Sequence, residues 1–278
     1  TEREHEIELF NPEEFWTLSV QFNDKDKNSI LASITQLNDK KIEKFSFKNK
    51  VEIDKAIEEV NSKKFNINDI SSKVVNRNPS GPFTTSTLQQ VSSGRLGFGA
   101  SRTMQIAQKL YQGIEIDGET IGLITYMRTD GTNLSKDAID SFRKYIKNEF
   151  GDEYVPDNAA SYSGKKAKNA QEAHEAIRPT DIMRAPDTVK KYLSPDQHKL
   201  YDLIWSRALS SQMKPAQFDR NTITITSDDN GAICKASGSV IKFDGFLKVM
   251  KDTKKDDDED ILPEMNKGPV NIESLLDE

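Results

Sequence analysis

The chain has 278 residues, of which 35% are hydrophobic and 30% charged, with a net charge of −6. This length favours two domains, and no apolar run reaches the roughly 18 residues of a membrane-spanning helix. No secretory signal peptide is recognisable. The single cysteine, Cys234, excludes a disulfide framework and is typical of a cytoplasmic protein.

The first part of the chain is predicted to be rich in β-strands. Residues 16–23, 30–37 and 40–47 alternate or carry short β-rich runs between polar turns, which favours an antiparallel meander. Apolar residues at helical spacing predict a helix over 51–64, and a further strand is expected over 69–78.

Helices are predicted to dominate after Pro79, Gly81 and Pro82, which mark a boundary. The predicted helices are 102–112 after Ser101 as N-cap, 136–150 after Ser135, and one from Pro195 with a capping box of Ser194 and Gln197. Asp117 and Gly118 predict a tight hairpin turn. Strands are expected again after Phe218.

This order of elements predicts a multidomain α+β protein. Two flanking segments, 11–85 and 213–278, are expected to form one discontinuous β-rich domain, and 86–212 an inserted, mainly helical domain. Residues 1–10 are expected to be the tail of a helix from a missing domain, and 268–278 stop without a closing element. We therefore expect the chain to be a piece of a larger protein.

The charge is unevenly distributed. Residues 79–220 carry 19 Lys and Arg against 17 Asp and Glu, whereas the remainder carries 20 against 28. The central segment is therefore the better candidate for a surface that binds phosphate groups.

The central segment contains an unusual run at 122–135, "GLITYMRTDGTNLS". The run begins like a buried strand, and in such an extended chain Ile124, Tyr126, Arg128 and Asp130 share one face. A phenol with a pKa of about 10 is a weak nucleophile, but it can attack phosphorus when positive charge stabilises the reacting groups. Arg128 can grip phosphate oxygens, and Asp130 can orient a neighbour. The plainer alternative is a partly buried tyrosine beside a structural ion pair.

A second candidate site is "QEAHEAIRPTD" at 171–181. On a helix ended by Pro179, His174 and Arg178 would share a face suited to an anion. Arg178 replaces the second histidine of the zinc-protease motif, which argues against a zinc site. The alternative is a surface helix with a neutral histidine.

Other polar stretches have plain interpretations. Residues 82–103, with Arg95 and Arg102, could hold phosphates, but ordinary helix capping is favoured. The basic run 164–168 is a possible phosphate contact. The acidic run 254–261 follows no buried strand, which favours a flexible loop over a metal site.

Taken together, four motifs resemble bacterial type IA DNA topoisomerases of the topoisomerase I kind. They are "PFTTSTLQQ" (82–90), "GFGASRTMQIAQKLYQG" (97–113), "GLITYMRTDGTNLS" (122–135) and "EAHEAIRPTD" (172–181). The resemblance implies that Tyr126 attacks a single-stranded DNA phosphodiester and keeps the 5′-phosphate as a phosphotyrosine. It implies that Arg128 positions the scissile phosphate. By the same resemblance His174, Arg178, Asp130 and Arg102 are expected to contact DNA.

The resemblance also implies an architecture and an activity. A β-rich arch would carry a winged-helix-like gate, and the enzyme would relax negatively supercoiled DNA without ATP in the bacterial cytoplasm, at the nucleoid. The Mg²⁺-binding Toprim domain is expected to precede residue 1, and C-terminal zinc modules are expected to be missing. No metal is expected on this chain, which alone should cleave little or no DNA.

Two other functions compete with this one. The first is a DNA-binding clamp whose tyrosine does no chemistry, which a Tyr126→Phe variant would distinguish. The second is a tyrosine recombinase, but the Arg and His cluster of that class is not suggested here.

Overall fold

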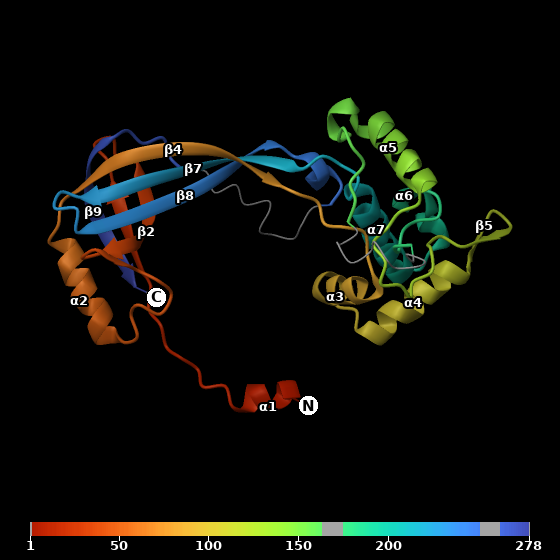
Figure 1. Cartoon of the computed structure of the whole chain (residues 1–278), viewed down its shortest axis with the longest axis horizontal. Coiled ribbons are helices and arrows are strands. Elements are labelled where there is room, and N and C mark those ends of the chain that lie inside the picture. Colours follow the sequence, from red (N-terminus) through yellow and green to blue (C-terminus); the bar gives the residue numbers. More distant parts are fainter. Residues whose placement is uncertain (1, 163–174, 251–261, 278) are drawn as a thin grey trace. The chain divides into compact units, whose positions relative to one another are not determined.

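The computed structural model describes residues 2–162, 175–250 and 262–277 (Figure 1). The chain divides into two compact units. The first comprises 1–75, 218–240 and 259–278, and the second comprises 76–217 and 241–258.

The first unit is built on a seven-stranded sheet in the order β1-β9-β4-β7-β8-β2-β3. Its strands are β1 (Leu18–Asn23), β2 (Ser29–Leu37), β3 (Lys40–Lys41), β4 (Phe65–Arg77), β7 (Ala216–Ser227), β8 (Ala232–Phe243) and β9 (Gly268–Asp277). An additional antiparallel pairing joins β1 to β2, so the sheet closes on itself.

The alternation of apolar residues determines which face of each strand is buried. Val20 and Phe22 of β1 are fully buried and lie opposite Ala32 and Ile30 of β2. Phe22 also packs edge-on against Phe65 at the start of β4, with ring centroids 5.1 Å apart. Alternating side chains thus build one core inside the closed sheet.

Helix α2 (Lys50–Asn61) packs its apolar residues into the same core. Asn49 caps it by accepting a hydrogen bond from the backbone N–H of Glu52, and Ile53 and Val60 are fully buried. The predicted helix over 51–64 is therefore present. Helix α1 (Glu2–Glu8) also lies where the charged N-terminal helix was expected.

Two strand predictions for this unit were wrong in extent, and one strand was not foreseen. The run 40–47 contributes only β3, because Glu43 and Ser46 close a turn through their backbone and side-chain groups. Strand β4 begins at Phe65, four residues before the predicted start. The unforeseen strand is β9, which pairs with β1 and β4.

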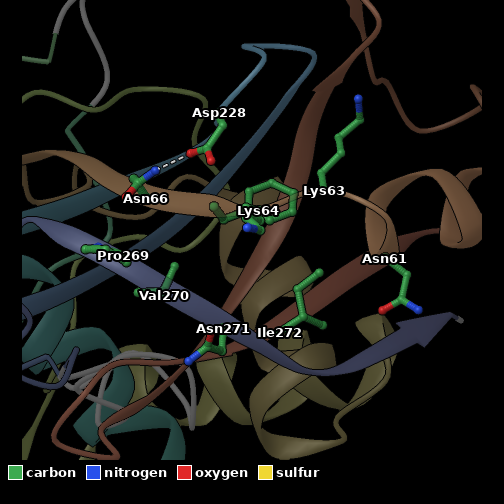
Figure 2. A pocket seen from close by; sticks show the side chains of 10 residues that line it. Asn61, Lys63, Lys64, Asn66, Asp228, Pro269, Val270, Asn271 and Ile272 are labelled. Carbon is green, nitrogen blue, oxygen red and sulfur yellow. Dashed lines mark hydrogen bonds between the residues drawn. The ribbon is translucent and has the colours of Figure 1, made fainter.

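The first unit also has an open hollow of about 550 Å³ between the end of α2 and strands β4 and β9 (Figure 2). Asn66 donates a hydrogen bond to Asp228 beside it. None of the side chains predicted to act on DNA lines this hollow.

The second unit is mainly helical. Its helices and hairpin strands are α3 (Thr85–Leu96), α4 (Ala100–Gln112), β5 (Ile114–Ile116), β6 (Glu119–Ile121), α5 (Lys136–Phe150), α6 (Pro186–Val189) and α7 (Pro195–Ser210). Of the described helices, none is long and apolar enough to cross a membrane.

The predicted caps of the second unit are confirmed with one exception. Ser135 caps α5, and Ser194 forms the capping box of α7 with Gln197. Helix α4 instead begins at Ala100 with Gly99 as N-cap. The carbonyl of Gly99 accepts bonds from both the backbone N–H and the hydroxyl of Thr103, so the helix starts two residues earlier than predicted.

We expect the Phe65→Ala variant to lower the free energy of unfolding by about 3–5 kcal/mol, because it removes a fully buried ring from the sheet core. Val74→Ala on the same strand, where the side chain is exposed, should cost less than about 0.5 kcal/mol. Urea unfolding followed by circular dichroism measures both. Equal losses would contradict this description of the core.

Candidate active site

The segment that carries Tyr126 is not the regular strand that was predicted. Residues 122–135 pair through isolated bridges only, from Ile124 to Pro179 and from Asn133 to Glu175. A ladder cannot continue through Pro179, which has no backbone N–H. The predicted strand is therefore an extended loop.

Exposure nevertheless alternates along this loop as in a strand. The Tyr126 side chain is 50% exposed, Arg128 and Asp130 are also exposed, and Met127 between them is buried. Ile124 was expected on the same face but is buried. The loop therefore presents a phenol, a guanidinium and a carboxylate to solvent and is anchored by the residues between them.

Residues 175–180 hold the loop on one side of Tyr126. The backbone N–H of Thr125 donates to the carbonyl of Arg178 (2.9 Å), and the Arg178 N–H donates to the Thr125 hydroxyl oxygen (3.0 Å). The same hydroxyl donates to the Ala176 carbonyl at 2.7 Å. Thr125, the residue before Tyr126, is thus bonded to a segment about 50 residues later through its backbone and its side chain.

The start of α3 holds the loop on the other side. The Thr85 hydroxyl donates to the carbonyls of Met127 (2.8 Å) and Thr129 (3.0 Å) and accepts from the Thr129 N–H at 2.8 Å. Thr84 caps α3 through a capping box with Thr87. The favoured interpretation of this hydroxyl-rich stretch as capping is confirmed, but the role of Thr85 was not foreseen.

The end of α4 forms the third contact with the loop. The N–H of Leu123 donates to the carbonyl of Leu110 at 2.8 Å. The rings of Tyr111 and Tyr126 pack edge to face, with centroids 5.3 Å apart and an interplanar angle of 65°. Sequence reasoning missed Tyr111, although it lies in a motif that carried the resemblance.

The prediction that Arg178 lies on a helix was wrong. Residues 175–180 are extended, with single bridges to Phe83, Ile124 and Asn133, because their backbone groups bond to other segments instead of to one another. The Arg178 guanidinium donates to Glu175 (2.7 Å) and to the Pro179 carbonyl (2.9 Å), and its side chain is only 15% exposed. His174 lies outside the described residues.

Glu175 is a second residue that sequence reasoning missed. Its carboxylate accepts hydrogen bonds from Arg178 and from the backbone N–H of Ser135, the N-cap of α5. Burial alone would raise the pKa of Glu175, but the bonds from Arg178 and Ser135 outweigh it, and the pKa is lowered. Glu175 therefore stays ionised and joins its own segment to α5.

Arg102 is partly engaged inside the protein. Its guanidinium pairs with Asp196 of α7 and lies over the ring of Phe98, 4.7 Å from the centroid. The side chain is still 56% exposed. Arg102 therefore lies on the surface of the second unit, with an acidic partner that an incoming phosphate would have to displace.

The described residues offer no fit for a divalent metal. Within residues 2–162, 175–250 and 262–277, no group of three or more His, Cys, Asp or Glu could hold a metal ion. The basic run 164–168 and the acidic run 254–261 lie outside these ranges.

An exposed phenol on a loop held from three sides, with an exposed arginine two residues on, is a candidate site for attack on a phosphate ester. The family described as DNA topoisomerase matches residues 1–276, and the chain belongs to this family. The resemblance to bacterial topoisomerase I is thereby confirmed.

Individual relatives agree with this assignment. The chain is 46% identical to DNA topoisomerase 1 of Rickettsia bellii over 93% of its own length, and 44% identical to that of Haemophilus influenzae over 94%. It covers 32% and 28% of those proteins, about a third of their length. The structure of full-length topoisomerase I from Thermotoga maritima matches all of the chain and 42% of that protein, with a TM-score of 0.76 and 33% identity.

We expect Thr85→Val to loosen the Tyr126 loop, because valine keeps the shape but leaves the Met127 carbonyl and the Thr129 N–H without the hydroxyl. The Thr129 carbonyl keeps its bond from the Thr85 N–H. The free energy of unfolding should fall by about 1–3 kcal/mol. Amide hydrogen exchange at Thr129 should accelerate. Ser86→Ala, at the exposed next position, is the matched control, and equal protection in both variants would contradict the role of Thr85.

A pH dependence follows from Glu175. Because its pKa is lowered by folding, its contribution to stability is complete above its ordinary pKa and is lost as the pH falls through the lowered value. Glu175→Gln should therefore lower the free energy of unfolding at pH 7, by less than about 1 kcal/mol because the Glu175 side chain is 32% exposed, and should lower it by less at pH 3. Thermal unfolding at both pH values tests this, and a loss that is larger at pH 3 would contradict it.

Proposed function

We propose that this chain carries the nucleophile of an enzyme that relaxes negatively supercoiled DNA by cutting and resealing one strand. The observation that carries the proposal is the half-exposed Tyr126 on a loop held from three sides, beside the exposed Arg128. Membership of the DNA topoisomerase family supports it.

The reaction is a transfer of a phosphodiester between two oxygens. The phenol oxygen of Tyr126 forms a bond to the scissile phosphorus of single-stranded DNA, and the bond from phosphorus to the 3′-oxygen breaks. The phenol proton leaves to a base and the departing 3′-oxygen takes up a proton. Resealing reverses these steps, and the retained ester bond makes ATP unnecessary.

The surrounding residues would bind and orient the DNA. Arg128 is the group suited to grip the non-bridging oxygens of the scissile phosphate, because a guanidinium can donate two parallel hydrogen bonds. Asp130 would orient the arginine or a neighbouring group. Arg102 and His174 would contact DNA further along the strand.

Arg178 is proposed to contact DNA as well, but its hydrogen bonds add a second role. With its guanidinium on Glu175 and its backbone on Thr125, it helps to fix the residue before the nucleophile. A phosphate contact would have to use guanidinium N–H groups of Arg178 that do not already donate to Glu175 or to the Pro179 carbonyl.

The remaining parts of the enzyme are assigned to the rest of a longer protein, since the chain spans about a third of its relatives. A Toprim domain would supply the acidic groups and Mg²⁺, and C-terminal zinc modules would lie beyond this chain. The segments 11–85 and 213–278 would form an arch that carries 86–212 as a winged-helix-like gate. The chain alone would cleave little DNA, and the enzyme would act in the cytoplasm at the nucleoid.

In the full-length protein with Mg²⁺, Tyr126→Phe should abolish the covalent adduct to end-labelled single-stranded DNA and reduce relaxation by at least about a thousandfold, because the nucleophilic oxygen is gone. DNA affinity should be retained. Tyr145→Phe, on α5 of the second unit, is the control, because phenylalanine keeps the ring that packs on Trp205. If the Tyr126→Phe variant still relaxes DNA, Tyr126 is not the nucleophile, and a DNA-binding clamp whose tyrosine does no chemistry becomes the better interpretation of this chain.

A further inference from the structure

We propose that Tyr111 is a positioning residue for Tyr126, holding the phenol in the orientation from which it attacks. This inference rests on the proposed function. It assigns a role to a side chain at the end of α4 that touches the candidate nucleophile.

The chain itself brings these two tyrosines together. Helix α4 ends after Tyr111, the hairpin of β5 and β6 reverses the chain at Asp117 and Gly118, and the return leads directly into the Tyr126 loop. The hydrogen bond from the Leu123 N–H to the Leu110 carbonyl joins the two ends of this stretch. One continuous stretch of chain therefore brings the two tyrosines together, and Thr85 and residues 175–180 hold the Tyr126 loop in place.

Two glycines allow the end of α4 and the start of the Tyr126 loop to approach each other closely. A Cβ atom at Gly122 would lie 2.7 Å from the carbonyl oxygen of Tyr111, closer than real Cβ contacts. Gly113 has a φ of +129°, and a Cβ there would clash with a side-chain carbon of Thr120. The backbone of Tyr111 can thus approach the start of the loop only because residue 122 has no side chain.

Within the described part of the chain, the ring of Tyr111 packs directly against the ring of Tyr126. The rings are 5.3 Å apart at 65°, a favourable edge-to-face geometry. Tyr111 is 41% exposed and Tyr126 50% exposed. The pair therefore restricts the two side-chain torsions of Tyr126 while half of the residue stays exposed, which lowers the cost of reaching an in-line orientation.

The first test is the rate constant of DNA cleavage in the full-length protein, measured by rapid quench on end-labelled single-stranded DNA with Mg²⁺. Tyr111→Ala should slow cleavage by about two- to tenfold, the range of an edge-to-face pair, and leave DNA affinity unchanged. Tyr111→Phe keeps the ring and should restore the rate. Phe150→Ala, which removes the aromatic contact to Tyr154 in the same unit, should not slow cleavage.

The second test needs no activity. In this chain with ¹³C-labelled tyrosine rings, the Tyr126 resonances, assigned through Tyr126→Phe, should shift in Tyr111→Ala and stay close to their original positions in Phe150→Ala. A wild-type cleavage rate in Tyr111→Ala, a loss confined to DNA affinity, or unshifted Tyr126 resonances would overturn the inference. An adduct that still forms in Tyr126→Phe would instead overturn the proposed function.

Discussion

The geometry of the candidate site depends on how the backbone polar groups around Tyr126 are satisfied. A loop of this kind has no ladder or helix to pair its N–H and C=O groups, and leaving them buried and unpaired would be costly. Backbone bonds to other segments satisfy some of these groups. Two threonine hydroxyls satisfy others: that of Thr125, next to the tyrosine, and that of Thr85 at the start of α3, which bonds to residues 127 and 129. Because each hydroxyl both donates and accepts, the loop is tied to two distant segments through single side chains.

This arrangement separates anchoring from chemistry by alternate residues. Met127 and Thr129 are buried, and their backbone groups make the bonds to Thr85 that anchor the loop, whereas the side chains of Tyr126 and Arg128 are exposed to solvent. The buried neighbours determine where the backbone of the loop lies, so the exposed side chains need not contribute to its folding and can serve chemistry. A nucleophile needs this combination of access and restricted motion.

Local signals in the sequence were sufficient for much of the structure. Ser135 and Ser194 cap their helices because a cap depends on the next three residues only, and the exposure of Tyr126 and Arg128 follows from a period of two. Arg178 was misplaced because helix-forming neighbours suggested a helix, while its backbone pairs with Thr125. Strand β9 was also missed because long-range pairing determines it: its backbone is bonded to β1 and β4, which lie far away in the sequence.

The position of β9 has a consequence for the order in which the chain can fold. Residues 268–277 pair with β1 near the start of the chain and with β4, so the sheet lacks the strand between them until they have been synthesised. The Tyr126 loop and its three contacts are complete by residue 180. On the ribosome, where segments fold as they emerge, the loop that bears the nucleophile can therefore form before the sheet of the first unit closes.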